Sequence, residues 1–519
     1  MFAAVKSLFV GHSAPTGSRA DTRVAPRVVL GVFITLVIAT WFRFVPWAPR
    51  LFFGDDLFNY MLYHGDRFQS KWADLFFADS GQKFRFVFSG LMHGQIWLFG
   101  KNTTAYFAAN VVIHAASSTV LALLVYRCCR NWTVALALSL MAAMSHLGVY
   151  EVTQATGQVE SLGLLFCMLT VLAVFEWHSV SKIESEHRLQ SSFKWISVLC
   201  AFLAFNSHER YIVLLPWLGL FFVLDRRAGT LWRRVTFVGI CLLLIGTNFL
   251  IKRWIFHSNF FQGTGGQPLA IHFSSIATLS SEAILSIIGV NHGPQYLTGA
   301  EWSDFSLFVR AMSLIFAMTC LSLVALVIAK RRKEFDSRAE PAGWWICCAI
   351  LIALLLLPAV LTIRMEQRWE LGPYYLLLTI VASGFGVLLG RGKTAIAACA
   401  LVLLAVSSFF IESRISRSLD IVSYLSVDRF AVAAKRAIID PPTSSQEGEL
   451  VFVADPGYCV GTLLDGGFFL VYGGKYRPVS CMSNVAQARA DACRRHARLF
   501  EWSSPEALVE VLNACEPVQ

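Results

Sequence analysis

Charged residues are scarce in this sequence. They make up 15% of the 519 residues, whereas 56% of the residues are hydrophobic and the mean hydropathy is +0.57. Soluble domains carry about 25% charged residues, so this composition excludes a soluble chain of ordinary domains. It suits a protein whose solvent is lipid.

Cysteine patterns that bind metals are also lacking. None of the 13 cysteines forms a CxxC pair, and no His/Cys spacing suits zinc, which argues against a structural metal. Nine cysteines lie in apolar runs or in the loops predicted inside, where a buried small side chain is the simplest interpretation. The other four lie in the C-terminal tail and allow one or two disulfides, among Cys459, Cys481, Cys493 and Cys515.

A signal-peptide cleavage site is missing as well. Residues 1–27 are polar and rich in small residues, and no small-residue cleavage site follows the first apolar run. We therefore expect that the first run stays in the protein as an uncleaved membrane anchor.

About eleven apolar runs are candidates for membrane spans. A helix rises about 1.5 Å per residue against a hydrocarbon core of about 30 Å, so roughly 17 to 25 residues are needed to cross. The fifth and sixth runs are short and meet at 206–210, which allows either a broken pair or two tilted spans. The eleven runs are 28–47, 104–126, 132–150, 160–177, 194–206, 210–224, 235–252, 305–329, 343–363, 373–390 and 394–411.

The positions of Lys and Arg predict the orientation of these spans. The formal net charge is +10, but the excess lies in short loops between the apolar runs, so it indicates topology and not nucleic-acid binding. When residues 1–27 are placed in the cytoplasm, every inside loop carries Lys or Arg, and the C-terminal tail lies outside. The outward segments are then about 48–103, 150–159, 253–304 and 412–519.

The tail differs in composition from the rest of the chain. Residues 450–453 form a β-like run that an Asp-Pro-Gly turn closes, and residues 467–472 resemble a second strand that two glycines follow. The expected fold class is therefore an all-α polytopic membrane protein with a small extracytoplasmic α/β domain at its C-terminus. The predicted parts are a cytoplasmic segment 1–27, a transmembrane domain 28–411 and the C-terminal domain 412–519.

Two adjacent carboxylates, Asp55 and Asp56, follow the first span among aromatic residues. Carboxylates at an apolar boundary lose hydration unless they are paired or used. A transferase needs such a group as a general base, which takes the proton of an acceptor hydroxyl while a phosphate leaves. Capping of an interfacial helix is the alternative, because Asp is a favoured N-cap residue.

Three outward arginines are candidates for binding an anion. Arg85 ends the first outward segment, and Arg holds phosphate by paired, charge-assisted hydrogen bonds; its alternative role is an interfacial anchor. Arg364 and Arg368 run against the positive-inside tendency, which favours an anionic ligand. Pairing with Glu366 and Glu370 is the alternative for both.

Ionisable residues also interrupt apolar sequence near two other outward ends of spans. Ionisable groups at membrane depth are costly, and they are usually paired with another group or serve a function. In the second of these places, the Glu and the Arg that follows it can simply pair with each other. The candidate residues are His146, Glu151, Glu160, His208 and Glu209.

The order of these motifs resembles that of the GT-C superfamily of polytopic glycosyltransferases. It is most similar to the O-mannosyltransferases that use polyprenyl- or dolichyl-phosphate-mannose. In that family an Asp-Asp pair follows the first span, as Asp55 and Asp56 do here. An Arg-Pro ahead of an apolar stretch resembles Arg85-Phe86, and an Asn with a His four residues later resembles Asn110 and His114.

The family's later motifs follow in the same order. Its second loop, His-Pro-x-His-x-Glu-Ala-Val and then Gly-Arg-x-Asp-x-Leu, is similar to the sequence around His146, Glu151 and Glu160. The resemblance extends over residues 28–390, and the departures from the pattern indicate a divergent, bacterial branch. A Lys-Glu pair corresponds to His208-Glu209, and a late Glu-Arg-x-x-Tyr corresponds to Gln367-Arg368 with Tyr374. The substitutions for Pro, Arg, Lys and Glu of the pattern are Phe86, Gln158, His208 and Gln367.

The resemblance implies an inverting transfer of a sugar from a polyprenyl phosphate to a glycan, lipid or protein acceptor. The reaction would take place at the outer face of a bacterial inner membrane and serve a cell-envelope glycan. Asp55 or Asp56 would be the base, with Asp55 favoured by its position, and the other carboxylate would orient the acceptor or a divalent ion. The residues implied in phosphate neutralisation are Arg85, Arg364 and Arg368, and those implied in lining the cavity are Glu151, Glu160 and Glu209.

Cofactor use stays open at this point. No hard-oxygen cluster is clearly complete in the sequence, so Mg²⁺ or Mn²⁺ would have to use Asp56 and Glu151. A flippase for lipid-linked glycans is a rival function, but it predicts a repeated half or paired broken spans, and the sequence has neither. A glycan ligase or polymerase with a pyrophosphate-linked donor, and an assembly factor without catalysis, are further rivals.

Overall fold

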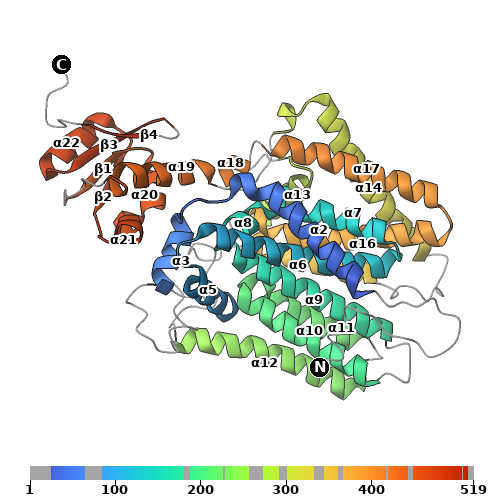
Figure 1. Cartoon of the computed structure of the whole chain (residues 1–519). Helices are drawn as coiled ribbons and strands as arrows, with labels where there is room; N and C mark the ends of the chain where they lie inside the picture. Colours follow the sequence, from blue (N-terminus) through green and yellow to red (C-terminus); the bar gives the residue numbers. More distant parts are fainter. Residues whose placement is uncertain are drawn as a thin grey trace.

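The structure is a computed structural model of the whole chain, shown in Figure 1. Arg364, Cys515 and most of the predicted outward segment 253–304 lie outside the residues that the structure describes. The described residues are 25–64, 85–180, 187–225, 228, 230–255, 273–290, 301–331, 344–360, 366–416, 419–422, 424–441, 448–504 and 507–511.

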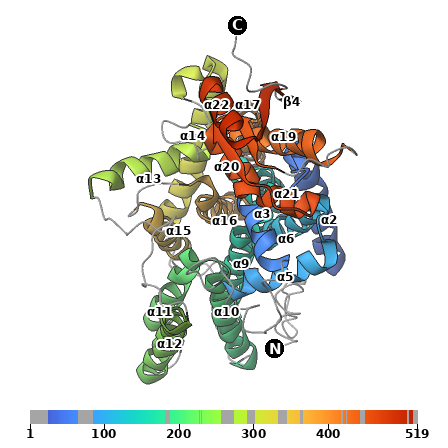
Figure 2. The same cartoon turned by 90° about the vertical axis from the view of Figure 1, so that its left-hand side faces the viewer.

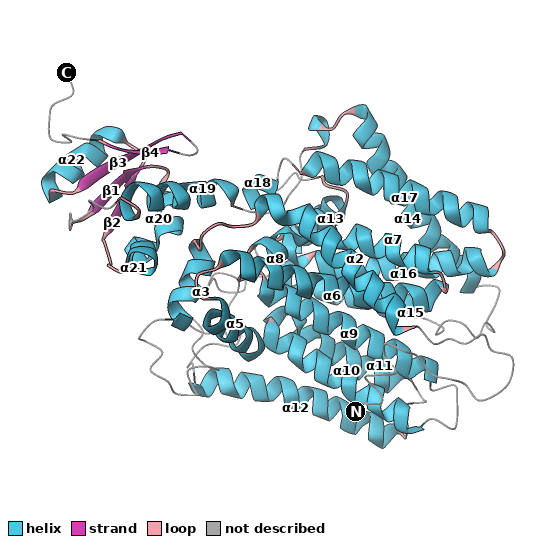
Figure 3. Cartoon of the chain, viewed as in Figure 1, coloured by secondary structure: helices cyan, strands magenta, loops and turns pink. Residues whose placement is uncertain are grey.

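Helices dominate the described chain, and a small domain with a β-sheet lies at one end of the helical bundle (Figures 1 and 3). Seven described helices are long and apolar enough to cross a membrane, and a bent pair of helices adds an eighth candidate. The chain is therefore a multi-pass membrane protein. The seven are α2 (Pro26–Phe44), α6 (Thr103–Cys129), α9 (Gln158–Val180), α12 (Leu231–Ile255), α14 (Leu307–Arg331), α16 (Leu371–Gly390) and α17 (Thr394–Ile415).

The bent pair lies at the predicted third run. It joins α7 (Trp132–Ala143) to the short helices η2 (His146–Gly148) and α8 (Val149–Thr153) with a bend of 52°. The chain bends where Ser145 adopts an extended conformation, and the Ser145 hydroxyl accepts a hydrogen bond from the Leu147 amide.

Each of the eleven predicted runs lies on a helix. The three remaining runs form α10 (His187–Ser207), α11 (Leu214–Leu224) and α15 (Trp344–Val360), which are shorter or less apolar than the seven. The fifth and sixth runs are two separate helices, because His208 has extended backbone angles (φ −149°, ψ 133°) and the short helix η4 (Glu209–Val213) follows it. A break at 206–210 is therefore confirmed, and neither helix is among the seven that are long and apolar enough to cross a membrane.

Three helices form the centre of the bundle. In their most apolar stretches α6, α9 and α16 are 72%, 83% and 89% buried, whereas α2, α12, α14 and α17 are only 22% to 28% buried. Large apolar side chains of the peripheral helices, such as Phe42, Leu243 and Phe409, are exposed in the isolated chain. Lipid is the solvent that would cover them. Figure 2 shows α11 and α12 side by side at the edge of the bundle.

The predicted outward segments contain further helices. Two of them, α3 (Gly54–His64) and α5 (Phe86–Phe99), lie in the first segment and follow η1 (Val45–Trp47). The third segment contributes α13 (Phe273–Ile287) and η7 (Trp302–Asp304), and η8 (Gln367–Trp369) precedes α16. Figures 1 and 2 place α3 between α5 and the C-terminal domain.

The C-terminal domain contains the sheet of the described chain, with strand order β2-β1-β3-β4. The central strand β1 pairs in parallel with β2 and with β3, and β4 is antiparallel to β3. The predicted α/β character of the tail is confirmed, including the strand at Leu450–Val453. The elements are α18 (Leu419–Val422), α19 (Leu425–Ala434), η9 (Lys435–Ile439), β1 (Leu450–Val453), α20 (Pro456–Leu463), η10 (Leu464–Gly466), α21 (Gly467–Gly473), β2 (Val479–Met482), α22 (Val485–Arg495), β3 (Arg498–Ser504) and β4 (Ala507–Glu510).

The second predicted strand, 467–472, is wrong, because this segment is the helix α21. A short, continuous apolar run has no periodicity that separates a strand from a helix. Here Gly466 and Gly474 adopt left-handed angles (φ 93° and 75°) at the two ends, which delimit a short helix. The rings of Phe468 and Tyr472, four residues apart, pack on each other with centroids 4.9 Å apart.

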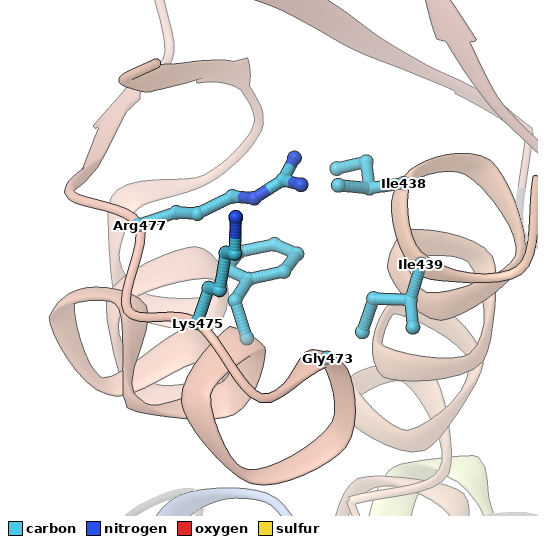
Figure 4. A pocket seen from close by; sticks show the side chains of 6 residues that line it. Ile438, Ile439, Gly473, Lys475 and Arg477 are labelled. Atoms are coloured by element: carbon cyan, nitrogen blue, oxygen red, sulfur yellow. The ribbon is translucent and has the colours of Figure 1, made fainter. Parts of the chain in front are cut away.

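One of the predicted disulfides is present within the described residues. Cys459 on α20 bonds to Cys481 on β2. The same domain has a small pocket between η9 and α21, into which Lys475 and Arg477 extend beside Ile438 and Ile439 (Figure 4). None of the predicted site residues lines this pocket.

Candidate active site

Asp55 and Asp56 lie in the first turn of α3 and face different surroundings. Successive residues of a helix are about 100° apart, so two neighbours cannot both point inward. Asp56 is buried, with 2% of its surface exposed, whereas Asp55 is exposed. Gly54, with a left-handed φ of 52°, precedes them and permits the turn into α3.

The carboxylate of Asp56 holds the second outward segment in place. Its Oδ2 accepts a hydrogen bond from the Ala155 amide (2.8 Å), and its Oδ1 accepts from both the amide and the hydroxyl of Thr156 (2.7 Å each). Burial raises the pKa of Asp56 to about 6, and these three hydrogen bonds oppose that rise. Asp56 is therefore engaged in positioning, and Asp55 is the carboxylate that an incoming molecule can reach.

Asn110 on α6 organises the same segment from the other side. Its Nδ2 donates hydrogen bonds to the carbonyls of Val152 (3.1 Å) and Gln154 (2.7 Å). The Nε2 of Gln158 donates in turn to Asn110 Oδ1 (2.6 Å) and to Gln95 Oε1 (2.8 Å). These buried amides satisfy the backbone where α8 ends, which fixes the loop that Asp56 binds.

Glu151 and His114 form a separate pair in the interior. Neither side chain is exposed, and His114 Nδ1 lies 3.9 Å from Glu151 Oε2. The other ring nitrogen of His114 lies 3.2 Å from the carbonyl oxygen of Ala143. A Cβ atom at Gly148 would lie 2.8 Å from His114 Cε1, so the glycine makes room for the imidazole. Glu151 thus packs inside the bundle and does not border solvent.

Glu160 lies at the centre of a buried cluster of charges. Its Oε2 is 3.2 Å from Arg210 Nε, and its Oε1 is 3.4 Å from His208 Nε2 and 4.0 Å from Arg368 Nε. The extended backbone at His208 and the η4 helix bring two of these partners to α9, and η8 brings the third. The predicted site residues Glu160, His208 and Arg368 are therefore brought together.

Glu209 forms ion pairs with a second set of cations next to this cluster. Its Oε2 accepts hydrogen bonds from Arg85 Nη2 (2.8 Å) and Nε (2.9 Å), and its Oε1 lies 3.6 Å from Lys252 Nζ. Arg85 precedes α5, and Lys252 lies in the last turns of α12. Arg85 and Glu209 were predicted site residues, whereas Lys252 was not.

Arg368 connects the charge cluster to the Asp pair. Its Nε lies 2.5 Å from Glu366 Oε2, and its guanidinium lies over the ring of Tyr150, 4.6 Å from the ring centre. The Tyr150 hydroxyl is 3.3 Å from Thr156 Oγ1, which donates to Asp56. Arg368 is therefore linked to Asp56 through Tyr150 and Thr156.

Four cationic side chains and three carboxylates make up the two sets around Glu160 and Glu209. The buried Glu151 lies beside them and interacts with Arg210. In a partly buried site, cations held in this way interact with an anion more strongly than they would in bulk water. The cations are Arg85, Arg210, Lys252 and Arg368, and the carboxylates are Glu160, Glu209 and Glu366.

No protein-family model and no curated protein matches the sequence. Solved structures do match the fold. ArnT from Cupriavidus metallidurans bound to undecaprenyl phosphate superposes with a TM-score of 0.50 at 10% identity, over 95% of this chain and 100% of that chain. The chain has the GT-C fold. ArnT in the apo state matches at a TM-score of 0.49 (13% identity, 91% of this chain and 92% of that chain), and the oligosaccharyltransferase AglB from Archaeoglobus fulgidus with an inhibitory peptide and a dolichol-phosphate matches at 0.45 (12%, 91% and 69%).

Whether this chain can bind a metal ion depends on the side chains at the site and not on the GT-C fold. Among the described residues, no group of three His, Cys, Asp or Glu side chains could hold a metal ion. Of the predicted ligands, Asp56 already accepts hydrogen bonds from Ala155 and Thr156, and Glu151 faces His114. These contacts engage both oxygens of Asp56 with the backbone and side chain of residues 155–156 and place Glu151 against His114.

Two predicted site residues of this GT-C chain lie in other surroundings. His146 Nδ1 is 2.8 Å from Glu412 Oε1, and Glu412 also pairs with Arg43 at 3.0 Å. Tyr374 is buried in the large apolar cluster of the bundle. The carbonyl of His146 also accepts a hydrogen bond from Gln367 Nε2. His146 therefore links α2, α17 and η8 to this segment.

Sequence reasoning missed several residues that the GT-C fold brings to the site. Tyr150 and Thr156 lay inside the motif around Glu151, but nothing in their spacing marks them as partners of Arg368 and Asp56. Lys252 carried a usable signal, because it is a cation at an outward end of a span, where the positive-inside tendency disfavours one.

Proposed function

We propose that this chain is a membrane glycosyltransferase that moves a sugar from a polyprenyl-phosphate-linked donor to an acceptor at the outer face of the membrane. The observation that carries the proposal is the chain of contacts from Arg368 through Tyr150 and Thr156 to Asp56. It joins the cationic cluster to Asp56, whose neighbour on α3 is the exposed carboxylate Asp55. The GT-C fold supports the proposal, because a protein with this fold has been solved with undecaprenyl phosphate bound.

Asp55 is the proposed general base. Its carboxylate takes the proton of an acceptor hydroxyl, and the hydroxyl oxygen forms a bond to the anomeric carbon of the donor. The bond between that carbon and the phosphate oxygen breaks, and its electron pair leaves with the polyprenyl phosphate. Attack from the side opposite the phosphate inverts the configuration of the anomeric carbon. Asp56 keeps α3 in place against the second outward segment during this step.

The cationic cluster is the proposed phosphate site. The leaving phosphate gains negative charge as the glycosidic bond breaks, and fixed cations in a water-poor site stabilise that charge most effectively. Arg368 is nearest to the Asp pair along the observed contacts, and Arg85 and Lys252 lie around Glu209. Glu160 and Glu209 hold these cations in position, because a carboxylate fixes a guanidinium more firmly than water does.

The proposed orientation places the N-terminus in the cytoplasm and the C-terminal domain outside, in a bacterial inner membrane. Lys and Arg in every predicted inside loop support it. The helix α3, which carries Asp55, and the C-terminal domain lie at the same end of the bundle, as this orientation requires (Figure 1).

A transfer assay on purified protein in nanodiscs tests the function. Radiolabelled polyprenyl-phosphate sugars are supplied with lipid, glycan and peptide acceptors, and wild type is compared with Asp55→Asn and Asp56→Asn. The Asp304→Asn variant is the matched control, since Asp304 is an exposed carboxylate in another predicted outward segment. We expect Asp55→Asn to lose about 100-fold to 10,000-fold in kcat, the range typical of a general base.

Two outcomes would overturn the assignment. Full transfer by both Asp variants would remove the carboxylates from catalysis. Turnover of pyrophosphate-linked donors alone, or flipping of a lipid-linked glycan without transfer, would point to the rival functions.

A further inference from the structure

The C-terminal domain holds the segment directly ahead of α3. The Asp428 carboxylate on α19 is buried, with 2% of its surface exposed. Its Oδ1 accepts hydrogen bonds from the backbone amides of Arg50 (2.8 Å) and Leu51 (3.3 Å), and its Oδ2 accepts from Arg50 Nε (2.8 Å). Both oxygens of one carboxylate thus bind a segment 378 residues earlier in the chain.

Tyr472 on α21 binds the next residue of the same segment. Its phenolic oxygen accepts a hydrogen bond from the Phe52 amide at 2.6 Å. Lys101 donates to the Val471 carbonyl and lies over the Tyr472 ring, 5.8 Å from its centre. Three consecutive backbone amides, at residues 50, 51 and 52, therefore have their acceptors in the C-terminal domain.

Packing joins α3 to the same domain. Leu57 and Tyr60 of α3 belong to one apolar cluster with Phe468 and Phe469 of α21. A Cβ atom at Gly467 would lie 2.6 Å from the sulfur of Met61, so the helices approach each other closely there. The helix that carries Asp55 is thus packed as part of the C-terminal domain and not only of the bundle.

We propose that the C-terminal domain positions the catalytic base, with Asp428 and Tyr472 as the positioning residues. This inference rests on the proposed function of Asp55. Three fixed amides immediately ahead of α3 leave its first turn little freedom, and small displacements of a base from its acceptor strongly reduce the rate. Asp428 and Tyr472 bind residues 50–52 and are not part of the proposed phosphate site, so we expect the donor to bind as before when they are replaced.

Hydrogen exchange and kinetics on the full chain in nanodiscs test this role. The variants are Asp428→Ala and Tyr472→Phe. Their controls are Asp491→Ala, a buried carboxylate that binds Arg494 and Arg495 of its own helix, and Tyr476→Phe, whose hydroxyl donates to Asp465. Exchange is followed in peptides that contain residues 50–52, and kcat, KM and the pH profile are measured per folded protein.

In the two variants we expect the amides of residues 50–52 to exchange at least tenfold faster. The kcat should fall at least fivefold with the donor KM within twofold of wild type, and the acid limb of the kcat profile should shift by at least half a pH unit. A loss of folded enzyme would scale the whole profile without moving it. The two controls should leave all these quantities unchanged.

Three results would overturn the inference, and they differ from a failure of the proposed function. Unchanged exchange at residues 50–52 would show that Asp428 and Tyr472 do not hold this segment, whatever the activity. Faster exchange with an unchanged kcat and pH profile would show that they hold the segment without a role in catalysis. Absence of transfer by wild type would remove the proposed function, and the positioning role with it, while the exchange data would still show whether the segment is held.

Discussion

Asp56 Oδ1 accepts two hydrogen bonds from a single residue, since the amide nitrogen and the hydroxyl of Thr156 both lie 2.7 Å from it. The same hydroxyl lies 3.3 Å from the hydroxyl of Tyr150. The guanidinium of Arg368 lies over the ring of Tyr150. Thr156 therefore connects α3, the helix that carries the proposed base, with Tyr150 at the proposed phosphate site.

Replacement of the Thr156 hydroxyl should uncouple these two parts. In Thr156→Val the amide still binds Asp56, but the hydroxyl contacts to Asp56 and Tyr150 are lost. We expect a stability loss of about 1 kcal/mol, the usual worth of one buried hydrogen bond, and a clear fall in kcat. Thr153→Val is the control, because its buried hydroxyl donates to the Val149 carbonyl one turn earlier in the same segment. Equal kcat values for the two variants would contradict the coupling.

The pH dependence of stability should report the state of Asp56. Its pKa is about 6 in the folded protein against 3.8 for an unperturbed Asp, so the folded state binds this proton more tightly than the unfolded state. The stabilisation is fully present below about pH 4 and is lost as the pH rises through about 6. Relative to Asp56→Asn, wild type should lose roughly 2.4 kcal/mol between pH 4 and pH 7.

Thermal unfolding of both proteins across this pH range measures the difference. A wild-type advantage that grows with rising pH would mean that the Thr156 and Ala155 hydrogen bonds dominate over burial. The Asp491→Asn variant serves as the comparison for a carboxylate whose pKa is lowered by arginines, where the sign of the pH effect is the opposite.

Loss of the Glu160 charge should disturb the cationic cluster. Glu160→Gln leaves Arg210 and Arg368 without their shared buried carboxylate, and breaking a buried pair in this way typically costs about 3 to 5 kcal/mol. The matched control is Glu176→Gln, whose partner Arg127 lies 2.6 Å away in another buried pair. Both variants should lose stability, but only Glu160→Gln should weaken donor binding, measured as the donor KM. Similar KM values in both would exclude Glu160 from the phosphate site.

The shape of the Arg368 side chain should matter as much as its charge. Lys in its place keeps the charge but loses the flat guanidinium that stacks on Tyr150. We expect Arg368→Lys to keep part of the activity of wild type and Arg368→Ala to lose about tenfold more, measured as kcat/KM for the donor. Arg310→Lys is the control, because Arg310 lies over Trp302 at 5.8 Å without a link to the Asp pair. Full activity of Arg368→Ala would refute a phosphate role.

The membrane-embedded part of this protein could be predicted from local sequence. Whether an apolar run enters lipid depends mainly on the composition of that run, and all eleven predicted runs overlap with helices. Seven of the described helices, or eight with the bent pair, are long and apolar enough to cross a membrane. The strand Leu450–Val453 and the Asp pair beside the first span were likewise visible, because turn residues and charges mark them locally.

Contacts between distant residues were decided by the tertiary structure alone. Asp55 is exposed and Asp56 buried because Ala155 and Thr156 lie beside α3, and Glu209 meets Arg85 across 124 residues of sequence. No periodicity encodes such a pair, since its energy depends on where two separate segments pack. For the same reason a continuous apolar run such as 467–472 becomes a helix or a strand only when its neighbours are in place.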